Sequence, residues 1–154
     1  VLDAMSRGVT VAEIQDATRR AQRHGIEAGL FVMLGYEGET MADIDATIDH
    51  LKLTQANTFL TTVAHPIKGT AYYSENQDRV EALEPWKERT ERDMRIRGRH
   101  SDIFYWFAQR RVTNEVLFHS LKNKKNGRML DRVSAFAKAK VAHLGMLSTR
   151  YSKS

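Results

Sequence analysis

Two short apolar runs with one amphipathic helical segment between them set the strongest limit on how this chain can fold. The first run, residues 27–34, is bounded by glycines, and the second, residues 58–64, is rich in β-branched side chains and ends at His65-Pro66. Runs of this kind are typical of buried parallel strands. A strand, a helix and a second strand in this order predict a right-handed βαβ crossover with parallel strands.

Capping signals predict where the helices begin. Thr10 with Glu13, and Thr40 with Asp43, have the spacing at which two residues cap a helix start reciprocally. The first pair predicts a helix over residues 10–24, and the second pair opens the helix between the two strands. One apolar stripe of that second helix consists of Met41, Ile44, Ile48 and Leu51.

Two parallel strands are too few for an independent sheet, because such strands need cover on both faces and further neighbours. The predicted fold class is therefore α/β, as part of a larger barrel or doubly wound sheet. Strand side chains such as Leu30, Val32 and Val63 are expected to be partly uncovered where neighbouring strands are missing. In either architecture, the functional face lies at the carboxyl ends of the strands.

The charge changes sign along the chain. Residues 1–84 carry 7 Lys and Arg against 13 Asp and Glu, a net charge of −6, whereas residues 85–154 carry 17 against 6, a net charge of +11. Pro85 lies at the break and suits the first turn of a helix. We therefore expect two units, an α/β part over residues 1–84 and a basic helical extension over residues 85–154.

The extension has the periodicity of helices. Apolar side chains recur over roughly residues 101–121, and a polar loop, residues 123–127, precedes the last helix. The last helix has a stripe formed by Leu130, Val133, Ala137, Val141 and Leu144. The run Phe104 to Phe107 could form a stacking platform, but aromatic side chains at helical spacing favour a position in the core.

Several classes of protein are excluded by what the sequence lacks. No run of side chains is long enough for a membrane span and no signal-peptide pattern opens the chain, so a cytoplasmic location is expected. Cysteine is absent, so the chain can form no disulfide and no thiolate-bound metal site or cluster. No histidine pairs with a carboxylate at a ligand spacing such as HExxH, and no metal site is predicted.

The segments that follow the two strands contain the candidate binding residues. Gly35 and Gly38 lie between a strand end and a helix start, where backbone N–H groups can approach a ligand closely. The alternative is an ordinary tight turn. At the second strand end, Pro66 favours an extended backbone at His65, so Ala64 and His65 present backbone groups that could pair with an adenine edge. The alternative there is a plain exit from strand to loop.

Taken together, three segments resemble the C-terminal half of the radical S-adenosylmethionine (SAM) barrel. They are VLDAMSRGVT at residues 1–10, GLFVMLGYEGET at residues 29–40 and FLTTVAHPIKGTAYY at residues 59–73. The family has a VLxxMxRG helix, a fifth strand ending in GxPGET and a sixth strand ending in PxxGTxxY, in this order and spacing. The sequence is most similar to members with an N-terminal cobalamin-binding domain, whose helical C-terminal extension also resembles residues 85–154. The resemblance implies the C-terminal portion of a partial (β/α) barrel followed by an α-helical extension.

The resemblance also implies roles for individual residues. Arg7 falls on the position whose guanidinium holds the methionyl carboxylate of SAM, and Met33 falls on the apolar position that packs against adenine. Ala64, followed by His65, falls on the position whose backbone meets the adenine edge. The loop after the fifth strand is matched by Gly35, Gly38 and Glu39.

The chain departs from the family pattern at three points. Glu37 replaces the usual proline of GxPGET, and Phe31 stands where some relatives have an aspartate that reaches the ribose. The CxxxCxxC loop that binds a four-iron cluster is missing. By the resemblance, the cluster ligands and any cobalamin domain would lie in polypeptide before Val1, and the chain would be an enzyme fragment that is not competent alone.

The resemblance implies SAM, a 4Fe–4S cluster and, in the cobalamin class, cobalamin as cofactors. In the family, the cluster reduces SAM, and the resulting 5′-deoxyadenosyl radical abstracts hydrogen from a substrate. Methyl transfer or a ring-forming oxidation of a small molecule is the expected reaction. The alternative is a non-enzymatic module whose basic half binds nucleic acid or another anionic partner. Such a module would gather its basic residues on one surface, whereas a packing extension would scatter them.

Overall fold

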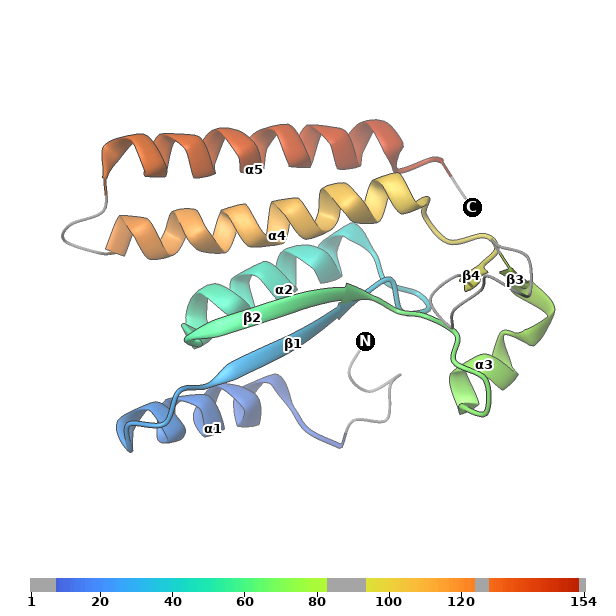
Figure 1. Ribbon diagram of the computed structural model, residues 1–154, viewed down its shortest axis with the longest axis horizontal. Helices are drawn as coiled ribbons and strands as arrows, with labels where there is room; N and C mark the ends of the chain where they lie inside the picture. Colours follow the sequence, from blue (N-terminus) through green and yellow to red (C-terminus); the bar gives the residue numbers. More distant parts are fainter. Residues whose placement is uncertain (1–7, 83–93, 124–127, 153–154) are drawn as a thin grey trace.

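The computed structural model describes residues 8–82, 94–123 and 128–152, and has a small parallel sheet with helices packed beside it (Figure 1). The α/β part contains α1 (Val11–Arg23), β1 (Gly29–Leu34), α2 (Met41–Thr54) and β2 (Thr58–Val63). It is followed by α3 (Ala71–Glu75), a 3-10 turn (Gln77–Arg79), β3 (Val80–Ala82) and β4 (Met94–Ile96). Two long helices complete the fold, α4 (Asp102–Asn123) and α5 (Met129–Thr149). In the described part of the chain, no helix is long and apolar enough to cross a membrane.

Both predicted helix starts are confirmed as reciprocal caps. The Thr10 hydroxyl accepts from the Glu13 N–H at 3.2 Å, and the Glu13 carboxylate accepts from the Thr10 N–H at 2.7 Å. Thr40 and Asp43 make the same pair of bonds at the start of α2. Each cap satisfies backbone N–H groups that have no partner within the helix.

The predicted βαβ unit is confirmed. β1 and β2 are parallel and in register from the pair Gly29 and Thr58 to the pair Leu34 and Val63. One face of this sheet packs against the buried side chains of α2. The other face is open, because the directly paired Phe31 and Leu60 are 86% and 59% exposed.

Partial burial of the strands also agrees with the sequence-based expectation. Leu30, Val32 and Val63 are only partly buried, although they pack against the core. The α/β class is therefore observed, in the form of a two-stranded parallel sheet with helices.

One apolar core joins the α/β part to the basic helices. It is formed by side chains from β1, α2, α4 and α5, namely Leu34, Ile44, Ile48, Leu51, Phe104, Tyr105, Ala108, Val112 and Met146. Phe104 and Tyr105 are buried as predicted, whereas Trp106 is 50% exposed. The Trp106 ring stacks under the Arg110 guanidinium at 3.7 Å, so the expectation of a core position was wrong for this residue.

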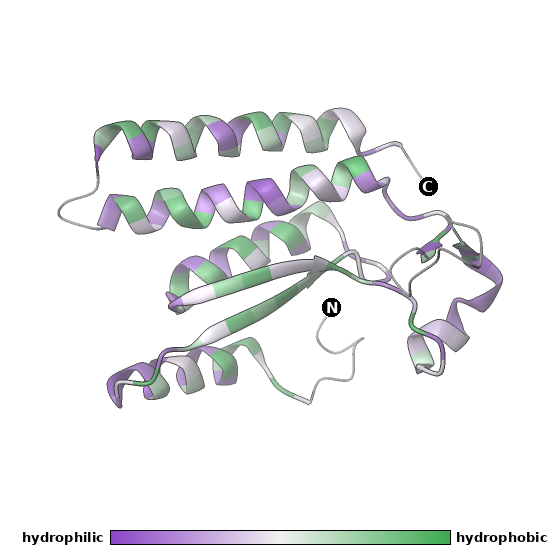
Figure 2. Cartoon of the chain, viewed as in Figure 1, coloured by the Kyte–Doolittle hydropathy of each residue, from purple (hydrophilic) through white to green (hydrophobic). Residues whose placement is uncertain are grey.

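The apolar stripe predicted on α5 does not face the core. Leu130, Val141 and Leu144 are 81%, 64% and 64% exposed, and α5 instead packs on α4 through its opposite face. That buried face consists of Ala135, Ala139, Ala142 and Met146. Figure 2 shows hydrophobic residues distributed along both long helices. The small side chains of this alanine face let α5 approach α4 closely. This close approach explains why α5 buries the alanine face and not the predicted stripe, although both have helical periodicity.

β3 and β4 were not predicted. They pair antiparallel from Val80 with Ile96 to Ala82 with Met94, and three residues per strand give too little alternation to recognise. The helix start predicted at Pro85, the boundary between the two expected units and most of the predicted 123–127 loop lie outside the described residues.

We predict that Gly145→Ala destabilises the protein. A Cβ at Gly145 would lie 2.5–2.6 Å from three atoms of the Phe107 ring, so the ring or the α4–α5 spacing must shift. Overpacking typically costs about 1–3 kcal/mol, against about 1 kcal/mol gained in helix propensity. We expect a lower midpoint in urea denaturation, and Leu144→Ala on the exposed face is the control. A midpoint at or above that of the wild type would show that the spacing between α4 and α5 can increase without loss of stability.

Candidate functional site at the strand ends

The carboxyl ends of β1 and β2 lie side by side, and both candidate segments begin there. Leu34 and Val63 form the last pair of the sheet, and the Ala64 N–H then donates to the Leu34 carbonyl at 2.8 Å. Gly35 and Ala64 are both buried next to this bond. The structure thus brings the residues after the two strands to one edge, as expected for parallel strands.

The turn after β1 is closed by its own glutamate. Gly35 and Gly38 have φ angles of 76° and 78°, a region that favours glycine. The Glu39 carboxylate folds back and accepts from the Gly35 N–H at 2.7 Å. The Gly35 N–H is therefore engaged within the turn, and its role in ligand binding stays a prediction.

Glu39 has an unusual protonation equilibrium. Burial raises the pKa of its carboxyl to about 7, an effect that outweighs the lowering by the Gly35 N–H. The nearby Asp43 carboxylate raises the pKa further, and the Arg99 guanidinium lowers it. Glu39 can therefore gain or lose a proton near neutral pH, as groups in acid–base sites often do.

Arg99 reaches the strand ends from the extension. Its Nη1 donates to the Gly35 carbonyl at 3.0 Å and to the Ala64 carbonyl at 2.7 Å. The guanidinium also lies over the Tyr105 ring, 5.5 Å from its centre. One cation thus holds the ends of both strands together. Sequence reasoning missed Arg99, because no local pattern links an arginine before α4 to the end of a strand 35 residues earlier.

Tyrosine rings pack around the turn. A Cβ at Gly35 would lie 2.9 Å from Cζ of the buried Tyr105, so only glycine fits there. Burial raises the pKa of Tyr105 to about 12, which keeps its hydroxyl protonated. Tyr36 and Tyr72 stack with ring centres 4.7 Å apart, and Glu37 forms an ion pair with Arg79 at 3.0 Å.

The other predicted site residues are placed as follows. Met33 is half-buried and pairs with Thr62, and strand alternation puts it on the open face with Phe31. His65 is half-buried at the same edge as Ala64. Arg7 lies outside the described residues.

At Ala64, the adenine contact implied by the resemblance stays a prediction. The Ala64 N–H donates to Leu34 and its carbonyl accepts from Arg99, so neither group is unengaged. Its carbonyl keeps one further lone pair for a ligand donor.

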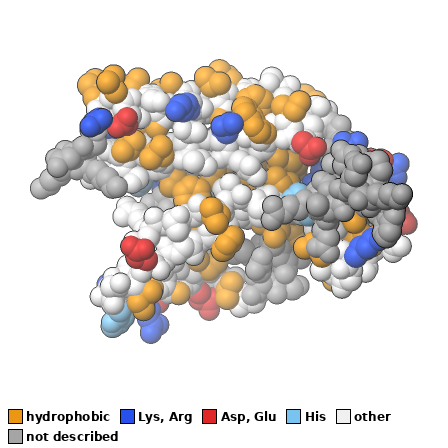
Figure 3. Space-filling view, viewed as in Figure 1, with side chains coloured by type: hydrophobic (Ala, Val, Ile, Leu, Met, Phe, Trp, Pro, Cys, Tyr) orange, Lys and Arg blue, Asp and Glu red, His pale blue; other side chains and the backbone are white. Residues whose placement is uncertain are grey.

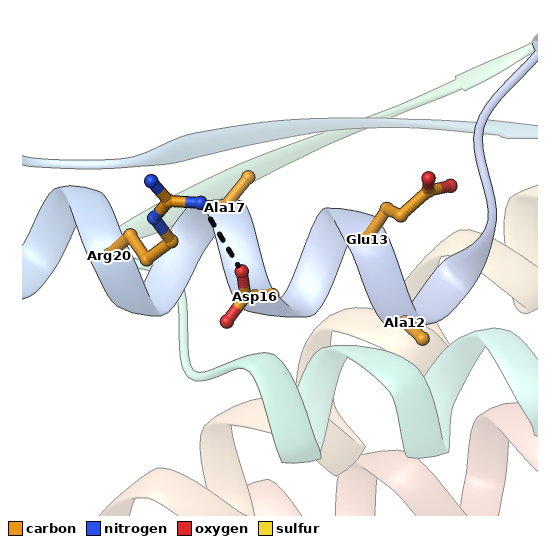
Figure 4. A pocket seen from close by; sticks show the side chains of 5 residues that line it. All are labelled: Ala12, Glu13, Asp16, Ala17 and Arg20. Atoms are coloured by element: carbon orange, nitrogen blue, oxygen red, sulfur yellow. Dashed lines mark ion pairs between the residues drawn. The ribbon is translucent and has the colours of Figure 1, made fainter.

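Apart from the strand-end site, a shallow pocket lies along α1 (Figure 4). Its lining comes from this helix alone, and Asp16 forms an exposed ion pair with Arg20 at 3.8 Å. Glu13 is held by the helix cap, and its hydrogen bonds to Thr10 lower its pKa. The carboxylates of this pocket are therefore engaged in helix stability.

Comparisons with protein-family models, with curated proteins and with solved structures found no match for this chain. The strand-end site is therefore interpreted from its own chemistry. It combines a carboxyl that titrates near neutral pH, a guanidinium on two carbonyls, tyrosine rings and an apolar sheet face. Among residues 8–82, 94–123 and 128–152, no group of three or more His, Cys, Asp or Glu could hold a metal.

We predict that Arg99→Met destabilises the fold by about 2–3 kcal/mol, because it removes charged hydrogen bonds to two carbonyls. Chemical denaturation measures the change. Arg110→Met is the matched control, since Arg110 is exposed and only stacks on Trp106, and it should cost less than about 1 kcal/mol. Equal losses in the two variants would mean that Arg99 does not tie the strands together.

We also predict that Glu39→Gln removes a pH dependence of stability. The unfolded chain releases this proton near its usual pKa of 4.5, whereas the folded chain keeps it until about pH 7. Wild-type stability therefore falls between these pH values, and the variant should gain about 2–3 kcal/mol relative to it across that window. Denaturation midpoints from pH 4.5 to 8 measure this. Glu75→Gln, an exposed substitution, should run parallel to the wild type, and the same parallel course for Glu39→Gln would contradict the raised pKa.

Proposed function

We propose that this chain is the C-terminal part of a radical SAM enzyme and supplies part of its SAM-binding face. The observation that carries the proposal is the meeting of the GYEGET turn and the AHP segment at one edge of a parallel strand pair. These are the segments on which the resemblance rests, and parallel strands bind ligands at this edge.

The residues fit SAM in part. Met33 on the open sheet face suits the flat apolar surface of adenine, and there is open space beside Gly38 in the turn. The Ala64 carbonyl has one lone pair left for an exocyclic amine, but Ala64 is only 2% exposed and its N–H is already bonded. Arg7, next to Gly8, would hold the methionyl carboxylate.

Under this proposal, Arg99 and Glu39 act on the shape of the site. Arg99 fixes the distance between the two strand ends, and Glu39 fixes the turn through the Gly35 N–H. Tyr105 packs behind Gly35 and excludes water from this side. None of these residues needs to react for the site to work.

The chemistry itself would come from cofactors. The chain has no cysteine, so the 4Fe–4S ligands and any cobalamin domain belong, in this proposal, to polypeptide before Val1. When bound, SAM would supply a carbon-centred radical for hydrogen abstraction from a small molecule. If the enzyme belongs to the cobalamin class, the proposed reaction is methyl transfer or a ring-forming oxidation. The proposed location of the enzyme is the cytoplasm.

The distribution of basic residues disfavours the anion-binding alternative. Arg111 is buried and donates to Asp45, Arg95 lies 3.4 Å from Glu81, and Arg99 is bonded to the strand ends. Figure 3 shows Lys and Arg side chains scattered among apolar ones over the long helices. Basic residues that pair within the fold support a packing extension rather than a nucleic-acid-binding face.

The proposal is tested on the full-length protein, first by reading the coding sequence upstream of Val1 for a CxxxCxxC motif. Calorimetric titration of SAM into the cluster-loaded protein then compares the wild type with Arg7→Ala. Loss of a charged hydrogen bond of about 1.5–3 kcal/mol predicts roughly 10- to 100-fold weaker binding. Arg7→Lys should recover part of the affinity, and Arg19→Ala on the exposed surface of α1 is the control. An upstream sequence without the motif would end the proposal, and unchanged affinity in Arg7→Ala would remove Arg7 from the site.

A further inference from the structure

A groove of about 860 Å³ lies on the side of the sheet edge away from β1. Its floor is the first part of β2, residues 58–61, and its walls are the end of α2 and the second half of α4. In Figure 1, α4 lies on the β2 side of the sheet, with α2 drawn between them in this view. The groove is separate from the strand-end site, because none of the site residues lines it.

The β2 edge in this groove has main-chain groups without strand partners. Within the described residues, β2 pairs with β1 alone. Thr58 donates to Ala28 and Ala64 donates to Leu34, both on the β1 side. Because backbone direction alternates along a strand, Phe59 and Thr61 direct their N–H and carbonyl groups away from β1. Both residues line the groove.

The α4 wall adds two apolar side chains among polar ones and carries no Asp, Glu, Lys or Arg of its own. Val116 and the 45% exposed Leu117 face the groove. The Lys52 ammonium is held by the Glu115 carboxylate at 2.8 Å, so it does not select for an acidic ligand. A row of backbone donors and acceptors beside a wall with two apolar side chains and no fixed charge matches an extended polypeptide segment with little charge.

We propose that this groove binds an extended, uncharged segment of a partner polypeptide, which adds to β2 as a third strand. Its backbone pairs with Phe59 and Thr61, and its alternate apolar side chains rest on Val116 and Leu117. Strand addition supplies affinity through the main chain, while the α4 wall selects the side chains. The same pairing would cover an edge that is otherwise open to unwanted association.

The test uses a labelled, terminally blocked heptapeptide without charged side chains, STVTVTS, and the same peptide N-methylated at alternate residues so that it cannot donate along one edge. Fluorescence anisotropy should show binding of the first peptide and at least tenfold weaker binding of the second. Hydrogen exchange at the Phe59 and Thr61 amides should slow when the first peptide is bound. Binding that tolerates N-methylation, or that leaves both amides unprotected, would overturn the proposal.

Variants in the wall complete the test. Leu117→Arg places a long charged side chain in the groove and should reduce binding at least tenfold, whereas Leu144→Arg on the exposed face of α5 should not. Ser120→Arg, at an exposed groove position, serves the same purpose if Leu117→Arg does not fold. Amide protection without peptide, together with dimers that Leu117→Arg dissociates, would assign the groove to a second copy of the chain and overturn the proposal.

Discussion

The packing of α4 against α2 is the contact on which the rest of this structure depends. A two-stranded parallel sheet buries too little apolar surface to be stable alone, and α2 covers one of its faces. The α4 side chains Phe104, Ala108 and Val112 complete that core and are fully buried. Burial of one aromatic or aliphatic side chain contributes about 1.5–3 kcal/mol to the free energy of folding. The helical extension therefore stabilises the α/β part and is not an independent appendage.

The same packing places the positively charged guanidinium of Arg99 at the strand ends. Arg99 lies three residues before α4. Because α4 begins beside the sheet edge, the Arg99 guanidinium reaches the carbonyls at the ends of both strands. The guanidinium stays among tyrosine rings and close to Glu39, whose carboxyl is largely neutral below about pH 7. A neutral Glu39 avoids an unpaired buried charge, whereas an ionised Glu39 gains the attraction of Arg99. The turn can therefore change its charge near neutral pH while its hydrogen bond to Gly35 persists.

The sequence was sufficient for local structure and insufficient for contacts between distant elements. The caps at Thr10 and Thr40 and the β-branched run of β2 predicted the βαβ unit, because each signal acts within a few residues. The α5 stripe was misread, since Leu130 and Ala135 belong to two apolar faces and only the approach of α4 selects one. At the site, Gly35 and Ala64 were predicted from the turns after the strands and Glu39 from the family resemblance, whereas Arg99 depends on where α4 begins in space.

Within the described residues, β1 and β2 pair only with each other, so each has one edge without a strand partner, and one face of the sheet is open. The edges and the face have different roles in the two proposals. Further barrel strands would pair with the free edge of β1 and cover Phe31 and Leu60, which face away from α2. The outer edge of β2 is different, because α4 stands beside it and forms one wall of the groove there. A single extended segment needs no helix of its own, so it can pair there without displacing α4. Strand addition at β2 is thus compatible with a barrel completed at β1, and either can be absent without the other.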